Sequence, residues 1–393
     1  MASSPSTPGN RFEALDGWRG ICACLVVLFH FHGFSPLYTS GLIRNSYLFV
    51  DFFFVLSGFV IACNYSTRLG NWEGVRRFLV LRVGRVYPLH LFMLALLVAY
   101  EAFRLLKGAA DGSDASVFSG ETHPLAIFTN LLLVQSLHIH DSLTWNGPAW
   151  SISTELWTYV IFALVSVWLG MRNWMLLLAA LAAPVLLLLL SKTGMDTTYD
   201  YGLIRCVFGF ALGVACFRLH RALPAAAPGG KPILMSLLEV MVVTTVVAFV
   251  SLVGTGVWSF TAPFIFAIAV LVFAIEGGVV SRLLRLPLLR WLGMVSYSIY
   301  MTHFFFVMVF PRIAKRIAGQ DLWTAMPVGN GQFVLAFGRN DLEGTLFYAV
   351  VLGMTLAFSA LTYRWVEVPG REWTRRWVNP STPPVTRASP QRT

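Results

Sequence analysis

The sequence predicts an all-α, polytopic membrane protein of about ten transmembrane helices, with the N- and C-termini in the cytoplasm. Of its 393 residues, 56% are hydrophobic and only 12% are charged, whereas soluble domains carry about 25% charged residues. The mean hydropathy of +0.68 agrees with this composition. Apolar runs long enough to cross a hydrocarbon core of about 30 Å recur along the chain.

Ten such runs are candidate spans. They are residues 17–34, 45–64, 86–103, 147–170, 174–191, 202–217, 233–253, 258–276, 292–310 and 344–363. The first run follows a polar start and contains polar residues, so we expect an uncleaved first span instead of a signal peptide. Pro, Ser and Thr are frequent in 1–10 and 379–393, which predicts disorder there. The expected organisation is a disordered tail at 1–10, a membrane domain at 11–370 and a basic, Pro-rich cytoplasmic tail at 371–393.

The loops indicate the orientation. With the N-terminus in the cytoplasm, most of the 29 Lys and Arg residues lie in cytoplasmic segments, as in other membrane proteins. Segment 124–139 is apolar but short, and if it spanned the bilayer the arginine clusters from Arg172 to Arg290 would face outward. We therefore expect a re-entrant or interfacial helix there, within a long external loop at 104–146. A second long external loop is expected at 311–343, and loops of this length are usually functional.

Some classes of function are disfavoured by the same features. The net charge of +10 is explained by cytoplasmic loops, and no zinc-finger or RNP-like pattern indicates nucleic acid binding. The five cysteines lie in apolar segments without metal-ligand spacing, so no metal is expected. No segment pattern is repeated between the two halves, which weakens a transporter built from duplicated units.

Four ionisable residues inside predicted spans are the candidate catalytic residues: His30, Asp51, Glu155 and His303. A charged residue at the bilayer centre costs about 2.5–3.5 kcal/mol, so such residues usually have a function. Counting the rise per residue from the span starts places all four in the outer half of the membrane. Each alone also has a structural explanation, such as a packed histidine, a helix-pairing aspartate or a capping glutamate.

Arginines form a second predicted layer at the inner face. Arg19 begins the first span, while Arg82 and Arg85 begin the third and share a helix face. Three guanidiniums on one rim would suit a phosphate group, although each alone could be a positive-inside anchor. Pro88 is expected in the first turn of the third span, where its missing N–H costs little. Arg19 lies on nearly the same helix face as His30, about 16 Å away along the axis.

Short motifs add candidate substrate-binding residues. DFFFVLSGF places Ser57 in the middle of a span, where small residues permit close helix packing or ligand entry. SYSIYMTH spaces Tyr297 and Tyr300 one turn apart, so that they line a cavity or anchor the helix at the interface. Trp150, in PAWSISTEL, completes this set.

LDGWRG followed by His30, DFFFVLSGF, RVGRVYP, WSISTEL and SYSIYMTH occur in this order. Together they resemble the acyltransferase-3 family of integral membrane acyltransferases, over residues 11–370. Its members include bacterial O-acetyltransferases of envelope glycans and macrolide acyltransferases. The resemblance implies about ten spans in the bacterial inner membrane and transfer of an acyl group, usually acetyl from acetyl-CoA. The chain is similar to the stand-alone form, without an SGNH-type domain.

The family's motifs map onto individual residues of this chain. Its Arg-to-His pattern falls on Arg19 and His30, and its paired arginines fall on Arg82 and Arg85. Its acidic residue falls on Asp51 and its glutamate on Glu155. We expect the nucleotide of the acyl-CoA donor at the arginines, with its arm reaching outward along the first span.

We expect His30 to act as general base or to carry the acyl group. Asp51 or Glu155 would orient its imidazole, and His303 is the second candidate for the central histidine. The acceptor would be a hydroxyl of a glycan or glycolipid at the outer side. The alternative is a transporter or flippase of a glycan or lipid precursor.

Overall fold

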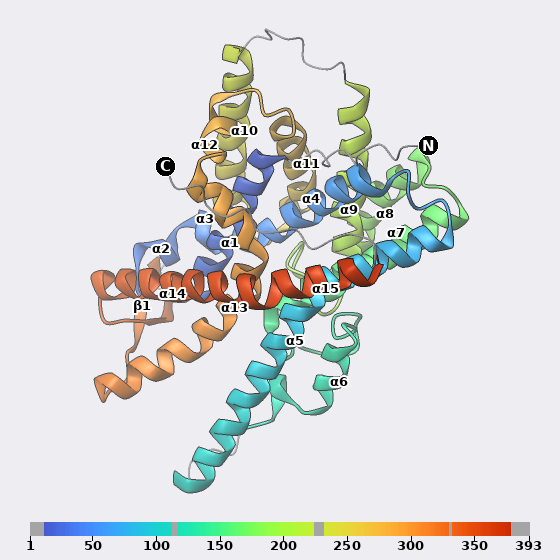
Figure 1. Cartoon of the computed structure of the whole chain (residues 1–393). Coiled ribbons are helices and arrows are strands. Elements are labelled where there is room, and N and C mark those ends of the chain that lie inside the picture. The colour runs from blue at the N-terminus through green and yellow to red at the C-terminus, as the bar shows by residue number, and fades with distance from the viewer. Residues whose placement is uncertain (1–11, 112–116, 224–231, 330–331, 379–393) are drawn as a thin grey trace, which may run out of the picture.

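Long helices build the structure (Figure 1). The computed structural model of the chain describes residues 12–111, 117–223, 232–329 and 332–378. The longer helices are α1 (Glu13–His30), α4 (Phe49–Tyr65), α5 (Trp72–Asp111), α7 (Trp150–Trp168), α8 (Asn173–Leu190), α9 (Gly202–Ala222), α10 (Pro232–Leu252), α11 (Ala262–Phe273), α13 (Pro287–Ala318), α14 (Asp341–Thr362) and α15 (Val368–Val378). A π-helical turn, η5 (Tyr363–Glu367), joins α14 to α15.

Shorter elements connect these helices. They are α2 (Pro36–Thr39), α3 (Gly41–Arg44), α6 (Leu125–Leu131), α12 (Val279–Leu284), the 3-10 turns η1 (Ser46–Leu48), η2 (Gly120–Thr122), η3 (Gly147–Ala149) and η4 (Val257–Thr261), and the strands β1 (Trp323–Gly329) and β2 (Gln332–Phe337). Within the described residues, eight helical segments are long and apolar enough to cross a membrane. Helix α1, and α11 with η4, occupy the other two predicted spans, so the predicted polytopic helical fold is confirmed.

Two helix boundaries change the interpretation of site residues. Helix α1 ends at His30 instead of continuing to residue 34, so His30 is its last residue and does not lie deep inside the span. Helix α5 begins at Trp72, and Pro88 therefore lies inside a 40-residue helix, not in a first turn as predicted. The polar, arginine-rich stretch before Pro88 hid this start, because the sequence prediction counted only apolar residues.

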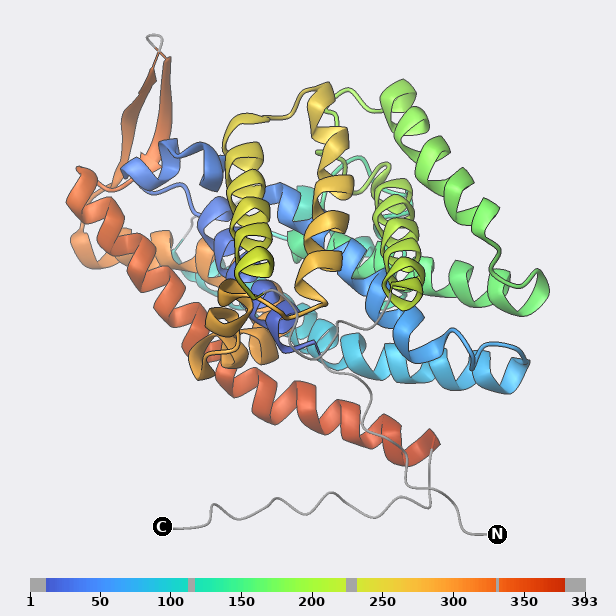
Figure 2. The same ribbon diagram turned by 90° about the horizontal axis from the view of Figure 1, so that it is seen from above.

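The two predicted external loops are partly structured. Helix α6 covers only seven residues, about 10 Å, so segment 124–139 does not span. In the second loop, α13 continues to Ala318, and β1 and β2 then form an antiparallel hairpin that the sequence analysis did not predict. Figure 2 shows this hairpin standing out from the helices on the side opposite α15.

The hairpin is attached to the end of α1. The backbone N–H of Phe337 donates to the carbonyl of His32 at 2.7 Å, and the N–H of Phe34 donates to the carbonyl of Phe337 at 2.9 Å. Of the predicted tails, 1–10 and 379–393 lie outside the described residues, while residues 371–378 belong to α15.

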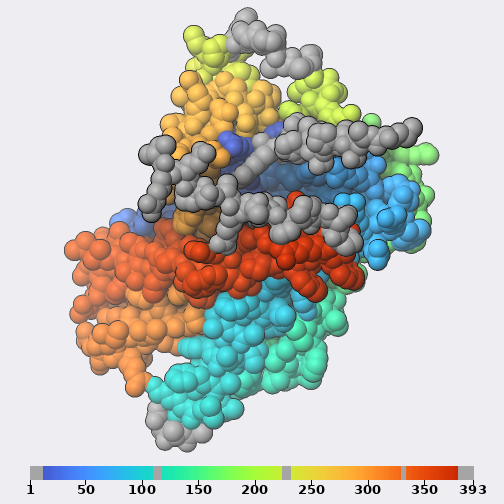
Figure 3. Space-filling model, in the orientation of Figure 1, coloured from blue at the N-terminus to red at the C-terminus, as the bar shows by residue number. Residues whose placement is uncertain are grey.

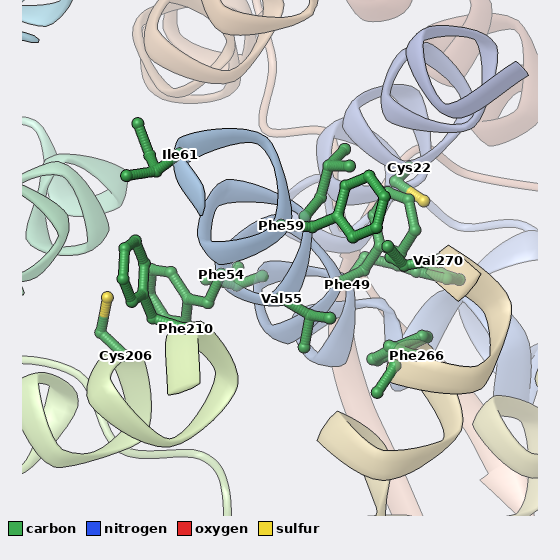
Figure 4. Close-up of a cluster of buried hydrophobic side chains, with 14 of the residues drawn as sticks. Cys22, Phe49, Phe54, Val55, Phe59, Ile61, Cys206, Phe210, Phe266 and Val270 are labelled. Atoms are coloured by element: carbon green, nitrogen blue, oxygen red, sulfur yellow. The ribbon is translucent and has the colours of Figure 1, made fainter. Parts of the chain in front are cut away.

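The core is formed by apolar side chains of α4 between α9 and α11 (Figure 4). Phe54 and Phe59 are almost completely buried, and Phe210 and Phe266 contribute from the flanking helices. Close packing is possible because Gly213 of α9 lies against the backbone of Val55, where a β-carbon would overlap. The core therefore fixes α4, which carries Asp51 and Ser57.

Glycines also join α1 to α13. A β-carbon on Gly20 would lie 2.7 Å from the backbone nitrogen of Gly293, so neither helix tolerates a side chain there. The two helices run in parallel, and each carries a histidine ten residues beyond its glycine. This packing brings His30 and His303 to the same level.

Candidate active site

The two histidines are in direct contact. Nε2 of His303 lies 3.2 Å from Nδ1 of His30. Nδ1 of His303 lies 2.7 Å from the carbonyl oxygen of Tyr300, and Nδ1 of His30 lies 2.9 Å from that of Val26. A carbonyl oxygen only accepts, so in the neutral tautomers each Nδ1 carries the proton.

This tautomer assignment gives the two rings different roles. Nε2 of His303 has a free lone pair and accepts from the Nδ1–H of His30. Nε2 of His30 is then unprotonated, and no described residue bonds to it. His303 is fully buried, whereas His30 is half-buried. The arrangement can take a proton at Nε2 of His30 and share the resulting positive charge with His303.

A narrow cavity of about 120 Å³ runs between α1, α4, α5, α7 and α13. Of the predicted site residues, its walls include Arg19, Ser57, Arg82, Arg85, Glu155, Tyr297 and Tyr300. The structure therefore brings the three predicted arginines to one cavity, at what we call the arginine-rich end of the bundle. His30 and His303 are not among its lining residues.

One ring of the cavity wall, that of Tyr300, contacts a histidine. Tyr300 and Phe53 both line the cavity, with ring centroids 6.0 Å apart, and the ring of Tyr300 lies 5.9 Å from that of His303. The Tyr300 hydroxyl donates to the carbonyl of Pro148 at 3.1 Å and accepts from Oγ of Ser151 at 2.9 Å. These bonds hold Tyr300 against the start of α7.

The three arginines differ in their partners. Arg19 donates to Asp16 at 3.2 Å and to Oγ of Ser296 at 3.0 Å. Arg82 donates to the Tyr65 hydroxyl at 3.0 Å. Arg85 forms no hydrogen bond or ion pair with any described residue. Its guanidinium donors are therefore available to an anion in the cavity.

Glu155 lies with these arginines and not beside His30. Its carboxylate accepts from the Tyr159 hydroxyl at 2.6 Å, and that hydroxyl accepts from Oγ of Ser57 at 2.7 Å. Among the described residues, Glu155 forms no hydrogen bond with His30, so its predicted role in orienting the imidazole stays a prediction. Counting residues along each helix ignores helix tilt and the direction of the side chain.

Asp51 likewise has another partner. Both of its oxygens accept from Arg205 of α9, at 2.9 Å and 2.8 Å, in a pair that is fully buried. Arg205 also lies over the ring of Trp150, 5.4 Å from its centroid. Asp51 thus forms no hydrogen bond with His30 among the described residues, and Trp150 packs on Arg205 without lining the cavity. Burial raises the pKa of Asp196, in the loop before α9, while the charge of Arg205 opposes this shift.

Sequence reasoning missed three buried polar residues, Arg205, Tyr159 and Glu367. Arg205 is ionisable and lies inside a predicted span, so the criterion that selected Asp51 also applied to it. Tyr159 is one turn beyond Glu155, on the same helix face. Glu367 is buried at the π-helical turn, where it accepts from Ser298 at 3.0 Å. No sequence signal pointed to this turn.

Together, the helical membrane fold, the histidine pair and the arginine-lined cavity are features of a membrane-embedded enzyme. Residues 12–364 match the family described as "Acyltransferase domain". The chain belongs to this family and is an acyltransferase, as its sequence motifs predicted.

Curated relatives agree with this assignment. The putative membrane-bound transacylase BcsY of Komagataeibacter xylinus is 26% identical over 384 residues, which cover 94% of this chain and 85% of that protein. The peptidoglycan O-acetyltransferase OatA of Listeria monocytogenes is 25% identical over 353 residues, 82% of this chain and 53% of that protein. Protein 2 in the picA locus of Rhizobium radiobacter is 34% identical over 192 residues, 46% of this chain and 95% of that protein. No solved structure matches the chain.

Proposed function

We propose that this protein transfers a short acyl group, in the first instance acetyl, from acyl-CoA to a hydroxyl of a glycan or glycolipid. The donor enters from the arginine-rich end, and the acceptor from the outer side of a bacterial inner membrane. The observation that carries the proposal is the histidine pair placed beyond one end of a narrow cavity that has three arginines at its other end. The glycan acceptor is supported by the name of OatA.

The reaction needs one base at the acceptor. Nε2 of His30 takes the proton of the acceptor hydroxyl as its oxygen attacks the thioester carbonyl. The tetrahedral intermediate then expels the CoA thiolate, which receives that proton from His30, so the charges balance. His303 accepts from Nδ1 of His30 and stabilises the transient imidazolium. General base catalysis of this kind contributes about 10²–10⁴-fold in rate.

The cavity is suited to the thin arm of the donor. Arg19, Arg82 and Arg85 would hold phosphate groups, while Ser57, Tyr297 and Tyr300 contact the arm. Glu155 and Tyr159 would position the arginines. For the thioester to reach Nε2 of His30, the ring of Tyr300 must move aside, because it lines the cavity and contacts His303.

The test uses membranes that carry the His30→Gln variant together with the envelope glycans of the host. Radiolabelled acetyl-CoA is added as the donor. We expect acetyl transfer to fall by at least about 10²-fold. His32→Gln is the control, because His32 is exposed and lies two residues beyond α1. Undiminished transfer by His30→Gln would refute the proposal. Label that remains on the wild-type protein but not on His30→Gln would favour an acyl-histidine over direct transfer.

A further inference from the structure

A second, larger hollow lies at the arginine-rich end of the bundle. This groove has a volume of about 1140 Å³ and lies between the end of α4, the first turns of α5, and η5 with α15. It is lined by six arginines, Arg68, Arg77, Arg82, Arg85, Arg371 and Arg375. Only two carboxylates, Glu73 and Glu372, lie among the lining residues. The groove is therefore strongly basic.

Helix α15 forms one wall of the groove. It packs against α5 through two glycines: Gly84 lies against Thr374, and Gly370 lies against the ring of Pro88. Figure 3 shows the C-terminal helices (red) crossing the face in view beside α5 (cyan). Helix α15 begins at Val368, beyond the residues 12–364 that match the family. This wall therefore lies outside the matched residues.

Several arginines of the groove lack a partner. Within the described parts of the chain, Arg68, Arg77 and Arg375 form no ion pair or hydrogen bond through their side chains, and all three are exposed. Arg371, in contrast, is paired with Glu367 at 3.3 Å. Unpaired guanidiniums that converge on one hollow are suited to several phosphate groups, since each binds phosphate in a planar, bidentate manner.

The groove and the cavity adjoin each other. Arg82, Arg85 and Val60 line both. The cavity is too small for a nucleotide, since ligand pockets of drug-sized molecules usually measure about 300–1,000 Å³, whereas the groove is large enough. A ligand with a bulky, multiply phosphorylated head and a thin tail would fill both, with its head at α15.

We propose that the groove binds the 3′-phosphorylated adenosine diphosphate portion of the acyl-CoA donor, with Arg68, Arg77 and Arg375 as phosphate ligands. The proposal rests on the function proposed above and assigns a site to one part of its donor. Arg82 and Arg85 then lie at the junction, where the nucleotide ends and the thin arm enters the cavity.

The kinetic test compares two donors in the full-length protein reconstituted in vesicles. Acetyl-CoA has the nucleotide, and acetyl-pantetheine lacks it. Arg77→Ala and Arg375→Ala should each raise the KM for acetyl-CoA by about 3–10-fold and leave that for acetyl-pantetheine unchanged. Arg76→Ala and Arg376→Ala are matched controls, because these neighbours do not line the groove. Equal effects on both donors, or equal effects of the controls, would overturn the proposal.

A binding experiment separates this proposal from the proposed function. Calorimetric titration of the purified protein with adenosine 3′,5′-bisphosphate and with CoA needs no acyl transfer. Binding to the wild type that is lost in Arg375→Glu supports the groove, even if acetyl-CoA proves not to be a donor. Transfer from acetyl-CoA that is indifferent to Arg77 and Arg375 overturns the groove and leaves the function standing.

The phosphate groups of membrane lipids are the alternative ligand for the arginines of the groove. The kinetic comparison is therefore repeated in vesicles of phosphatidylcholine alone, which carry no net anionic lipid. A KM effect of Arg375→Ala that persists there supports a nucleotide site. An effect that appears only when anionic lipid is present would assign these arginines to the membrane surface and overturn the proposal.

Discussion

Nε2 of His303 lies 3.2 Å from Nδ1 of His30, although the two residues are 273 positions apart. The contact depends on the parallel packing of α1 and α13 at Gly20 and Gly293, ten residues before each histidine. A histidine thus occupies the place that a carboxylate takes in a catalytic triad. A neutral imidazole orients its partner without adding a negative charge to the site.

Replacing His303 should therefore impair turnover more than binding. We expect His303→Gln to lower kcat by at least about 10-fold while the KM for acetyl-CoA stays within about twofold, because His303 acts through His30. Kinetics in reconstituted vesicles measure both constants. His303→Asn provides a second variant with a shorter side chain. An increase in KM with unchanged kcat in both variants would place His303 in donor binding instead.

The glycine contact can be tested by stability. Gly293→Ala places a methyl group against the backbone of Asp16, so we expect it to destabilise the protein by about 1–3 kcal/mol. Gly353→Ala in α14 is the control, because nothing lies within 4 Å of its β-carbon. That control should stabilise the helix by about 0.5–1 kcal/mol. Thermal unfolding in detergent compares the two, and equal midpoints would contradict the expected tight packing.

The buried Asp51–Arg205 pair should be structural. Asp51→Asn leaves the Arg205 charge without its partner, and breaking a buried pair costs about 3–5 kcal/mol. We expect a large loss of folded protein, measured by size-exclusion chromatography in detergent. The double variant Asp51→Asn with Arg205→Met should recover part of it. If Asp51→Asn folds normally but lowers kcat, the carboxylate acts in the reaction.

The ring pair of Phe53 and Tyr300 should restrict access to the thioester. Phe53→Ala removes a cavity-lining ring that packs against Tyr300, whose own ring contacts His303, so water can reach a bound donor. We expect CoA release in the absence of acceptor to rise by about 3-fold or more, because an open site permits hydrolysis. A reagent that reacts with the free thiol of CoA measures the rate of this release. Phe49→Ala, in the core and outside the cavity lining, controls for a general loss of packing. A release rate equal to that of the wild type would exclude this role.

The sequence predicted the helices well, because apolar runs of sufficient length have few alternatives in a membrane. It also selected the three arginines that line the cavity and both histidines of the contact. It did not predict the hydrogen-bond partners of Asp51 and Glu155, because the direction of a side chain depends on helix packing. The partner of Asp51, Arg205, lies on a helix more than 150 residues away, and no local pattern connects them.

The hairpin hydrogen bonds have a mechanical consequence. β2 is joined to the chain at His32 and Phe34, directly after the helix that ends at His30. The hairpin also follows α13, which carries His303, so both histidines belong to elements that meet at its base. The position of the hairpin is therefore tied to the segment that directly follows His30.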